Sequence, residues 1–201
     1  MNTAVDIELI KTKVQELICH AAVTRIADHA RQENIELVGD IRPAKVGQVL
    51  GNWMTIILVT GEALRITLKF HFSLAEAQAL SHRVYGLPSA DKVSEGKAID
   101  FIKELANLTA GFIVQTCESR EIPMGISLPL CTRGFYEVFA DYADADYPLL
   151  RFSDLWCLEH EGQKIYGTAL IEISDVAKLA PLSNFDPSQS DAEEDSEFDF
   201  L

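Results

Sequence analysis

Nine consecutive residues, 64–72, alternate strictly between apolar and polar side chains. The apolar positions are Leu64, Ile66, Leu68, Phe70 and Phe72, and the polar positions are Arg65, Thr67, Lys69 and His71. A period of two is typical of a β-strand that has one face on a core and the other in water. A β-prone run at residues 45–60 precedes it, and Thr60, Gly61 and Glu62 predict a hairpin turn between the two strands. The chain therefore contains an antiparallel sheet, one face of which must be covered.

Two long amphipathic helices could provide that cover. Apolar residues recur every three or four positions over residues 5–33, and again over residues 95–118. Ser73 and Glu76 form a capping box that predicts a short helix after the hairpin. A short strand at 123–129 cannot be central at Pro129, which has no N–H to donate, and two more strands are expected at 149–160 and 164–173. We predict an α+β fold, a largely antiparallel sheet with long helices packed on one face.

Composition limits the domain count and the kinds of partner. With 201 residues and 48% apolar content, the chain can bury one core, and we expect a single domain at residues 1–182. Residues 183–201 form an acidic tail, with seven acidic residues and no basic one from Asp186 onward, a composition that usually stays solvated. The net charge of −14 argues against nucleic acid and anionic membranes as partners. A protein partner or a small ligand is favoured.

The sequence shows no pattern typical of a membrane span, a signal peptide, a disulfide framework or a metal site. No apolar run approaches the roughly 20 residues of a spanning helix, and the first residues lack a signal-peptide layout, so we expect a cytoplasmic protein. The four cysteines have no C-x-x-C spacing and lie in apolar surroundings, which indicates buried, reduced thiols. The five histidines are equally dispersed, so we expect no metal site.

The second long helix carries a polar row. Each residue advances roughly 100° around a helix, so Asp100, Glu104, Asn107 and Gly111 share a narrow sector. Apolar residues and threonines gather on the opposite side: Ile102, Leu105, Thr109, Phe112, Ile113 and Thr116. A rigid carboxylate and amide beside a glycine suit the capture of a polar partner, although an ordinary solvated face has the same spacing.

These residues also belong to a longer pattern. Asp100-x-x-x-Glu104-x-x-Asn107, then 21 residues and Pro129, with the strings ELANLTAG and GISLP, resembles the signature of the CheX branch of the CheC/CheX/FliY family. Those proteins are phosphatases of the phosphorylated chemotaxis response regulator CheY. The order of elements over residues 7–173 is also similar. CheC-like members carry two Glu-x-x-Asn motifs, whereas no other glutamate here is followed by asparagine three positions later, which implies one site, as in CheX.

The resemblance implies a mechanism for two-component signalling in chemotaxis. Glu104 and Asn107 are the implied catalytic residues: Asn107 orients the attacking water, and Glu104 pairs with a lysine of the CheY-like receiver domain. Asp100, Gly111 and Pro129 are candidate binding residues. The Mg²⁺ ion belongs to the phosphorylated receiver, so no cofactor or metal site of the chain's own is expected. CheX-like proteins dimerise through their sheets, which implies a homodimer.

Two alternatives remain open from the sequence. The chain could be a non-catalytic adaptor that keeps the fold and binds a signalling or flagellar protein through the polar row, the sheet edge or the tail. A small-molecule enzyme lacks support, because the sequence has no Gly-rich phosphate loop, nucleophile elbow or metal-ligand cluster.

Overall fold

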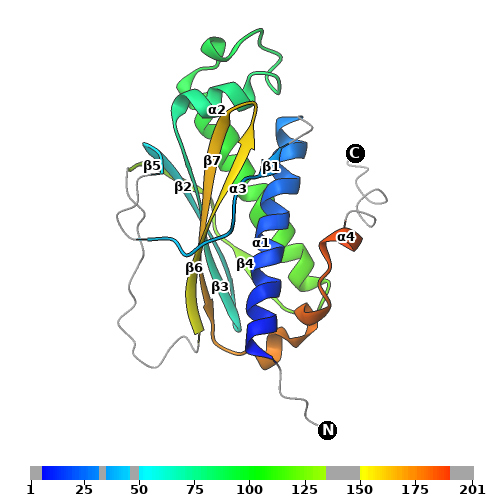
Figure 1. Ribbon diagram of the computed structural model, residues 1–201. Helices are drawn as coiled ribbons and strands as arrows, with labels where there is room; N and C mark the ends of the chain where they lie inside the picture. Colours follow the sequence, from blue (N-terminus) through cyan, green and yellow to red (C-terminus); the bar gives the residue numbers. More distant parts are fainter. Residues whose placement is uncertain (1–5, 32–34, 46–49, 135–149, 191–201) are drawn as a thin grey trace.

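The computed structural model describes residues 6–31, 35–45, 50–134 and 150–190, and it has an α+β architecture (Figure 1). Two long helices, α1 (Ile7–Ala30) and α3 (Glu95–Glu118), lie side by side over one face of an antiparallel sheet. The shorter α2 (Leu74–Ser81) lies at one end of the sheet. The described C-terminal part forms η2 (Ala177–Asn184) and α4 (Pro187–Ser190), which pack beside α1. The predicted fold class is confirmed.

Within the described residues the sheet has seven strands, in the order β1-β6-β7-β3-β2-β4, with β5 also paired to β2. The strands are β1 (Glu36–Leu37), β2 (Trp53–Gly61), β3 (Leu64–Phe72), β4 (Met124–Ile126), β5 (Leu130–Arg133), β6 (Leu150–His160) and β7 (Gln163–Ile173). All pairs are antiparallel. β4 and β5 follow each other along the outer side of β2, so together they form one edge of the sheet.

Local sequence signals define the helices well. The Asp6 side chain accepts hydrogen bonds from the backbone N–H groups of Glu8 (3.0 Å) and Leu9 (3.3 Å) and so begins α1. The capping box of α2 is complete, since Ser73 and Glu76 each bond the other's backbone N–H. η1 (Ala90–Lys92) precedes α3, whose bounds agree with the prediction from periodicity.

The β2–β3 hairpin differs from its prediction in one detail. Gly61 is the last residue of β2, and the turn is made by Glu62 and Ala63. A Cβ atom at position 61 would lie 2.5 Å from Met124 Sδ and 2.6 Å from the Pro123 carbonyl oxygen. Glycine is therefore needed here because β4 passes close to β2, and not because of the turn geometry.

The alternation predicts that the polar face of β3 is exposed to solvent. This prediction is wrong at Lys69 and His71, which are only 2% and 1% exposed. β3 is central in the sheet, between β2 and β7, so its side chains are flanked on both sides. On this face Met54 of β2 and Thr168 of β7 are buried as well, and His71 Nε2 lies 3.1 Å from Thr168 Oγ1. Alternation correctly predicted the strand, but not the environment of its polar side.

The four cysteines are free thiols. Cys19 and Cys117 are buried, and burial raises the pKa of each thiol to about 12. Cys131 and Cys157 are only partly buried, so the expectation of four buried thiols is wrong for these two. Their strands β5 and β6 lie toward the sides of the sheet, where neighbouring side chains cover less of each residue.

The packed part of the chain extends beyond residue 182. Phe185 is 1% exposed, and its ring contacts the His20 ring at 6.2 Å between centroids. The Arg120 guanidinium lies 5.6 Å from the same ring. Phe185 therefore belongs to the core and not to a solvated tail. The Asp- and Tyr-rich segment 136–147 and the end of the acidic segment, 191–201, lie outside the described residues.

One contact fixes how β6 lies against β7. Trp156 and Gly167 are paired in register, and the Trp156 indole covers Gly167 so closely that an added Cβ would lie 2.1 Å from the Trp156 Cε2 atom. Trp156 is 2% exposed, so the indole has no free space into which it could move. The glycine is therefore required by packing.

We expect Gly167→Ala to lower the free energy of unfolding by about 1–3 kcal/mol, because the added methyl group overpacks the Trp156 site. Chemical denaturation measures the change. Gly96→Ala is the matched control, since a Cβ there meets no atom within 4 Å. A Gly167→Ala protein as stable as the parent would show that the indole moves freely.

Candidate functional site

The orientation of α3 follows from its buried face. Ser94 caps the helix by accepting a hydrogen bond from the Lys97 N–H at 3.4 Å. The predicted core side of α3 is buried throughout: Ile102, Leu105, Thr109, Phe112, Ile113 and Thr116. These residues pack against α1 and the strands β2 to β5. Asp100 and Glu104 are consequently exposed, and Asn107 and Gly111 are partly exposed.

The sheet edge beside α3 contains a β-bulge. Ile126 pairs with Val59, and Leu130 pairs with Ile56, so three residues (127–129) on the edge face two residues (57–58) on β2. Ser127 bridges the irregular step: its N–H donates to the Leu58 carbonyl at 2.9 Å, and its Oγ accepts from the Leu58 N–H at 3.0 Å. Pro129, which has no N–H, fits a position without a ladder hydrogen bond.

An open hollow of about 480 Å³ lies between α3 and this bulge. Its lining residues are Asp100, Lys103, Glu104 and Asn107 from α3, and Leu128, Pro129 and Leu130 from the edge. One wall is therefore polar and charged, and the other is apolar. Ligand sites usually combine apolar walls with a few convergent polar groups.

No described side chain of the protein occupies the polar wall. Among the described residues, the side chains of Asp100, Glu104 and Asn107 make no hydrogen bond or ion pair, and neither does that of Lys103. Within the described part of the chain, the Asn107 amide is therefore partly exposed and makes no side-chain hydrogen bond.

Glu104 and Lys103 lie toward different sides of the helix. On the α1 side, the His29 ring stacks on Phe101 at 4.4 Å, and His29 Nε2 donates to the Phe101 carbonyl at 3.1 Å. Burial lowers the pKa of His29, while the carbonyl bond and the nearby Glu104 charge oppose that shift. On the sheet side, burial raises the pKa of Cys131, and the Lys103 ammonium opposes this. Asn107 lies one turn beyond both charges.

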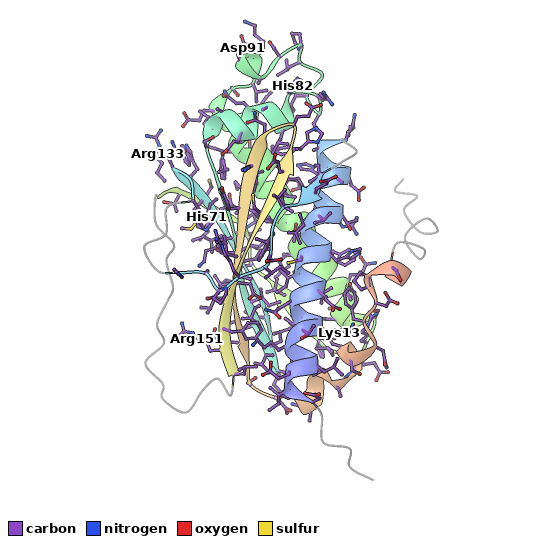
Figure 2. All side chains as sticks on the ribbon, in the orientation of Figure 1. Lys13, His71, His82, Asp91, Arg133 and Arg151 are labelled. Atoms are coloured by element: carbon purple, nitrogen blue, oxygen red, sulfur yellow. The ribbon has the colours of Figure 1, made fainter. Side chains whose placement is uncertain are left out.

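The first turns of α3 are held by contacts from two directions. The Tyr85 hydroxyl donates to the Lys97 carbonyl at 2.9 Å, and burial, aided by the Asp100 charge, raises the pKa of Tyr85. Figure 2 shows Arg133 at the outer edge of the sheet, where it pairs with Glu95 at 3.4 Å. Because both contacts tie α3 to its neighbours, the polar wall is held in place by the fold and not by its own side chains.

The structure brings together four of the five residues predicted from sequence: Asp100, Glu104, Asn107 and Pro129 all line the hollow. Gly111 lies one turn beyond Asn107, outside the lining. A Cβ there would meet no atom within 4 Å, so the glycine leaves open space on the helix surface.

Three lining residues were missed from sequence: Lys103, Leu128 and Leu130. Lys103 could have been found from its spacing of four residues to Asn107 on the same helix. The leucines had no such signal, because apolar residues near a strand are normally expected in the core.

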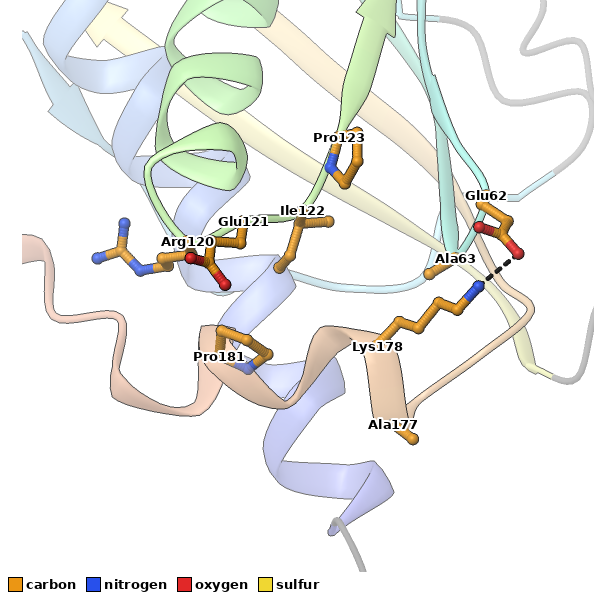
Figure 3. Close-up of a pocket in the computed structure, with 9 residues that line it drawn as sticks. All are labelled: Glu62, Ala63, Arg120, Glu121, Ile122, Pro123, Ala177, Lys178 and Pro181. Carbon is orange, nitrogen blue, oxygen red and sulfur yellow. Dashed lines mark ion pairs between the residues drawn. The ribbon is translucent and has the colours of Figure 1, made fainter.

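A second hollow of about 330 Å³ lies at the far end of α3, between the β2–β3 hairpin and η2 (Figure 3). Four charged residues line it, Glu62, Arg120, Glu121 and Lys178, and two of them, Glu62 and Lys178, form an ion pair with each other. Its two acidic and two basic residues balance in charge, whereas the polar wall beside the bulge carries two carboxylates and one ammonium.

The described residues contain no group of three or more His, Cys, Asp or Glu side chains that could hold a metal ion. Within the same part of the chain, no helix is both long and apolar enough to cross a membrane.

The fold is that of the CheC/CheX chemotaxis proteins. A CheC-like superfamily protein from Shewanella sp. PV-4 superposes with a TM-score of 0.64 at 14% identity, over 80% of this chain and 97% of that one. CheX from Vibrio vulnificus matches at a TM-score of 0.59 and 11% identity, over 78% and 97%. CheX from Borrelia burgdorferi, solved as a complex of CheX, CheY, BeF₃ and Mg²⁺, matches at a TM-score of 0.58 and 17% identity, over 78% and 96%. No protein-family model and no curated protein matches the sequence.

The His29 ring reports on the position of Glu104. We expect an NMR titration to place the pKa of His29 below 6.5, because burial disfavours the imidazolium. Since the folded state then binds the proton less readily than the unfolded state, His29 makes folding less stable as pH falls below 6.5. Glu104→Gln should lower the His29 pKa further, because it removes a charge that favours the imidazolium.

Glu118→Gln is the matched control, since Glu118 is exposed on the same helix but does not contribute to the His29 shift. An unchanged His29 titration in Glu104→Gln would place the carboxylate away from the ring.

Proposed function

We propose that this protein is a phosphatase that hydrolyses the aspartyl phosphate of a CheY-like response regulator. The observation that carries the proposal is the pair Glu104 and Asn107, one helical turn apart on the wall of an open hollow, with no partner among the described side chains. The fold shared with CheX, including a CheX solved with CheY, BeF₃ and Mg²⁺, supports a receiver domain as the partner. BeF₃ stands in for a phosphoryl group.

Asn107 is the residue we propose for positioning the attacking water. Phosphoryl transfer has a loose transition state, so the catalyst mainly supplies position and charge balance. The amide oxygen of Asn107 accepts a hydrogen bond from the water while its NH₂ group donates to a neighbouring oxygen, which aligns the water without a titrating base. The receiver supplies Mg²⁺, so the chain needs no metal of its own.

Glu104 is the residue we propose for recognition. Its exposed carboxylate lies on the same face as Asn107 and would pair with the lysine of the receiver's phosphorylation site. Asp100, one turn earlier, adds negative charge to this wall, and Pro129 shapes the bulge opposite it. Gly111 leaves room for the receiver's surface beside the hollow. A homodimer remains part of this proposal, to be checked by analytical ultracentrifugation.

Asn107→Ala should lower the rate constant for hydrolysis by about 10²-fold or more, with only a modest loss of receiver binding, because it removes the group that positions water. Phosphate release from a phosphorylated CheY-like receiver measures the rate. Gln115→Ala, which removes an exposed amide from the same helix, is the matched control and should be as active as the parent. An Asn107→Ala protein with parental activity would refute the assignment.

Glu104→Gln should raise KM roughly 10-fold, because a charge-assisted contact that binds the receiver is lost. It should also reduce kcat, because the same contact holds the helix in register with the receiver, and Asn107 is then less well placed to position the water. The KM of the parent should also rise with salt more steeply than that of the variant. Kinetics at two salt concentrations measure both effects, with Glu118→Gln as the control. Equal KM values for Glu104→Gln and the parent would argue against an ion pair with the receiver.

A non-catalytic adaptor is the alternative, and one measurement separates the two. An adaptor binds the beryllofluoride-activated receiver without accelerating loss of phosphate, whereas the phosphatase does both.

A further inference from the structure

Leu128 and Leu130, which form the apolar wall of the hollow, are 84% and 69% exposed. We call these two residues the apolar rim. They lie at and directly after the bulge at 127–129, which interrupts the edge strand beside β2. Bulges at sheet edges often serve this purpose next to functional sites. The rim is therefore built by the fold at the site and does not lie on a random part of the surface.

The rim and the polar wall face the same open space. Asp100 and Glu104 contribute two carboxylates to that space, Lys103 contributes one ammonium, and none of these three charged groups is paired among the described side chains. The surface is thus net acidic on one side and apolar on the other. A binding partner that fits it must carry basic groups next to an apolar side chain.

This charge pattern discriminates among three possible occupants. The acidic C-terminal segment of the same chain, which has no basic residue from Asp186 onward, would be repelled by Asp100 and Glu104. A second copy placed on this surface would bring the same net negative wall against itself. A different protein with a basic surface is the occupant that satisfies both walls.

We propose that the apolar rim is the docking surface for an apolar side chain that lies beside the basic groups of the phosphorylated receiver. This inference rests on the proposed function and adds to it a separation of roles. The polar wall positions the water and makes electrostatic contacts with the basic groups of the receiver, whereas the rim supplies binding energy. Burying the rim stabilises the ground state and the transition state alike. It therefore lowers KM without changing kcat.

The test uses the full chain with Leu128→Ser, and with Leu128→Ser combined with Leu130→Ser. The substrate is a phosphorylated CheY-like receiver for kinetics, and the same receiver activated with beryllofluoride and Mg²⁺ for binding. We expect KM and Kd to rise about 10-fold for the single variant and more for the double variant, with kcat within a factor of about two of the parent. The salt dependence of KM should be unchanged, because the carboxylates remain.

Leu37→Ser is the matched control, because Leu37 is an exposed leucine (37%) on β1, at the opposite edge of the sheet. Its KM should equal that of the parent. Circular dichroism melts confirm that the variants are folded, which the exposure of Leu128 leads us to expect. The single variant keeps β5 intact, so it tests the rim even where the double variant is unstable.

The outcomes separate this inference from the proposed function. If the parent hydrolyses the phosphorylated receiver and Leu128→Ser has the parental KM, the docking role is refuted and the phosphatase stands. If the parent binds the receiver without hydrolysis and the rim variants lose binding, the rim stands and the catalytic proposal is refuted. If the parent neither binds nor hydrolyses any receiver, both are refuted. A change of oligomeric state in the rim variants would assign the rim to a second copy instead and overturn the proposal.

Discussion

The burial of one face of α3 is the constraint on which the rest of the site depends. Ile102, Leu105 and Phe112 lie in the core, and they allow the helix only one rotation about its axis. Turning the helix by one residue, roughly 100°, would bring a carboxylate of the polar row toward the apolar core, at a cost of several kcal/mol. The hydrophobic packing of α3 therefore places the amide and the carboxylate outside, and no hydrogen bond of their own is needed to hold them there.

The second element of the site is the β-bulge at the edge of the sheet. β4 and β5 both pair with β2, but they are out of register with each other by one residue, and Leu128, Pro129 and Leu130 at this step make the opposite wall of the hollow. The Ser127 side chain replaces one ladder bond, and Pro129 removes the need for another. The irregular step in this edge strand carries two exposed leucines that lie beside a charged helix. The apolar and polar walls thus arise from separate elements that meet only in the folded chain.

Such a site suits catalysis on a partner's substrate. The protein contributes a rigid amide and carboxylate on a helix, and the proposed reaction takes its phosphoryl group and its Mg²⁺ from the receiver. Preorganised groups on a helix lose little freedom when the partner binds, which favours positioning over acid–base chemistry. The same rigidity is equally useful to an adaptor, and the two proposed roles differ in whether the Asn107 amide positions a water molecule.

The sequence by itself determined the elements and the polar row. Periodicities of 2 and 3.6 depend on each residue's near neighbours along the chain, so β3, α1 and α3 and the shared face of Asp100, Glu104 and Asn107 could all be predicted. Pro129 could be assigned to the same site only from the resemblance to the CheX signature. Tertiary structure decided the rest: the burial of Lys69 and His71, the close approach of β4 to Gly61, and the placement of Lys103 and two exposed leucines beside Asn107. These features depend on which strand or helix passes beside each residue. Which element lies beside a residue is set by pairing between segments that are distant in sequence. It therefore cannot be predicted from local periodicity.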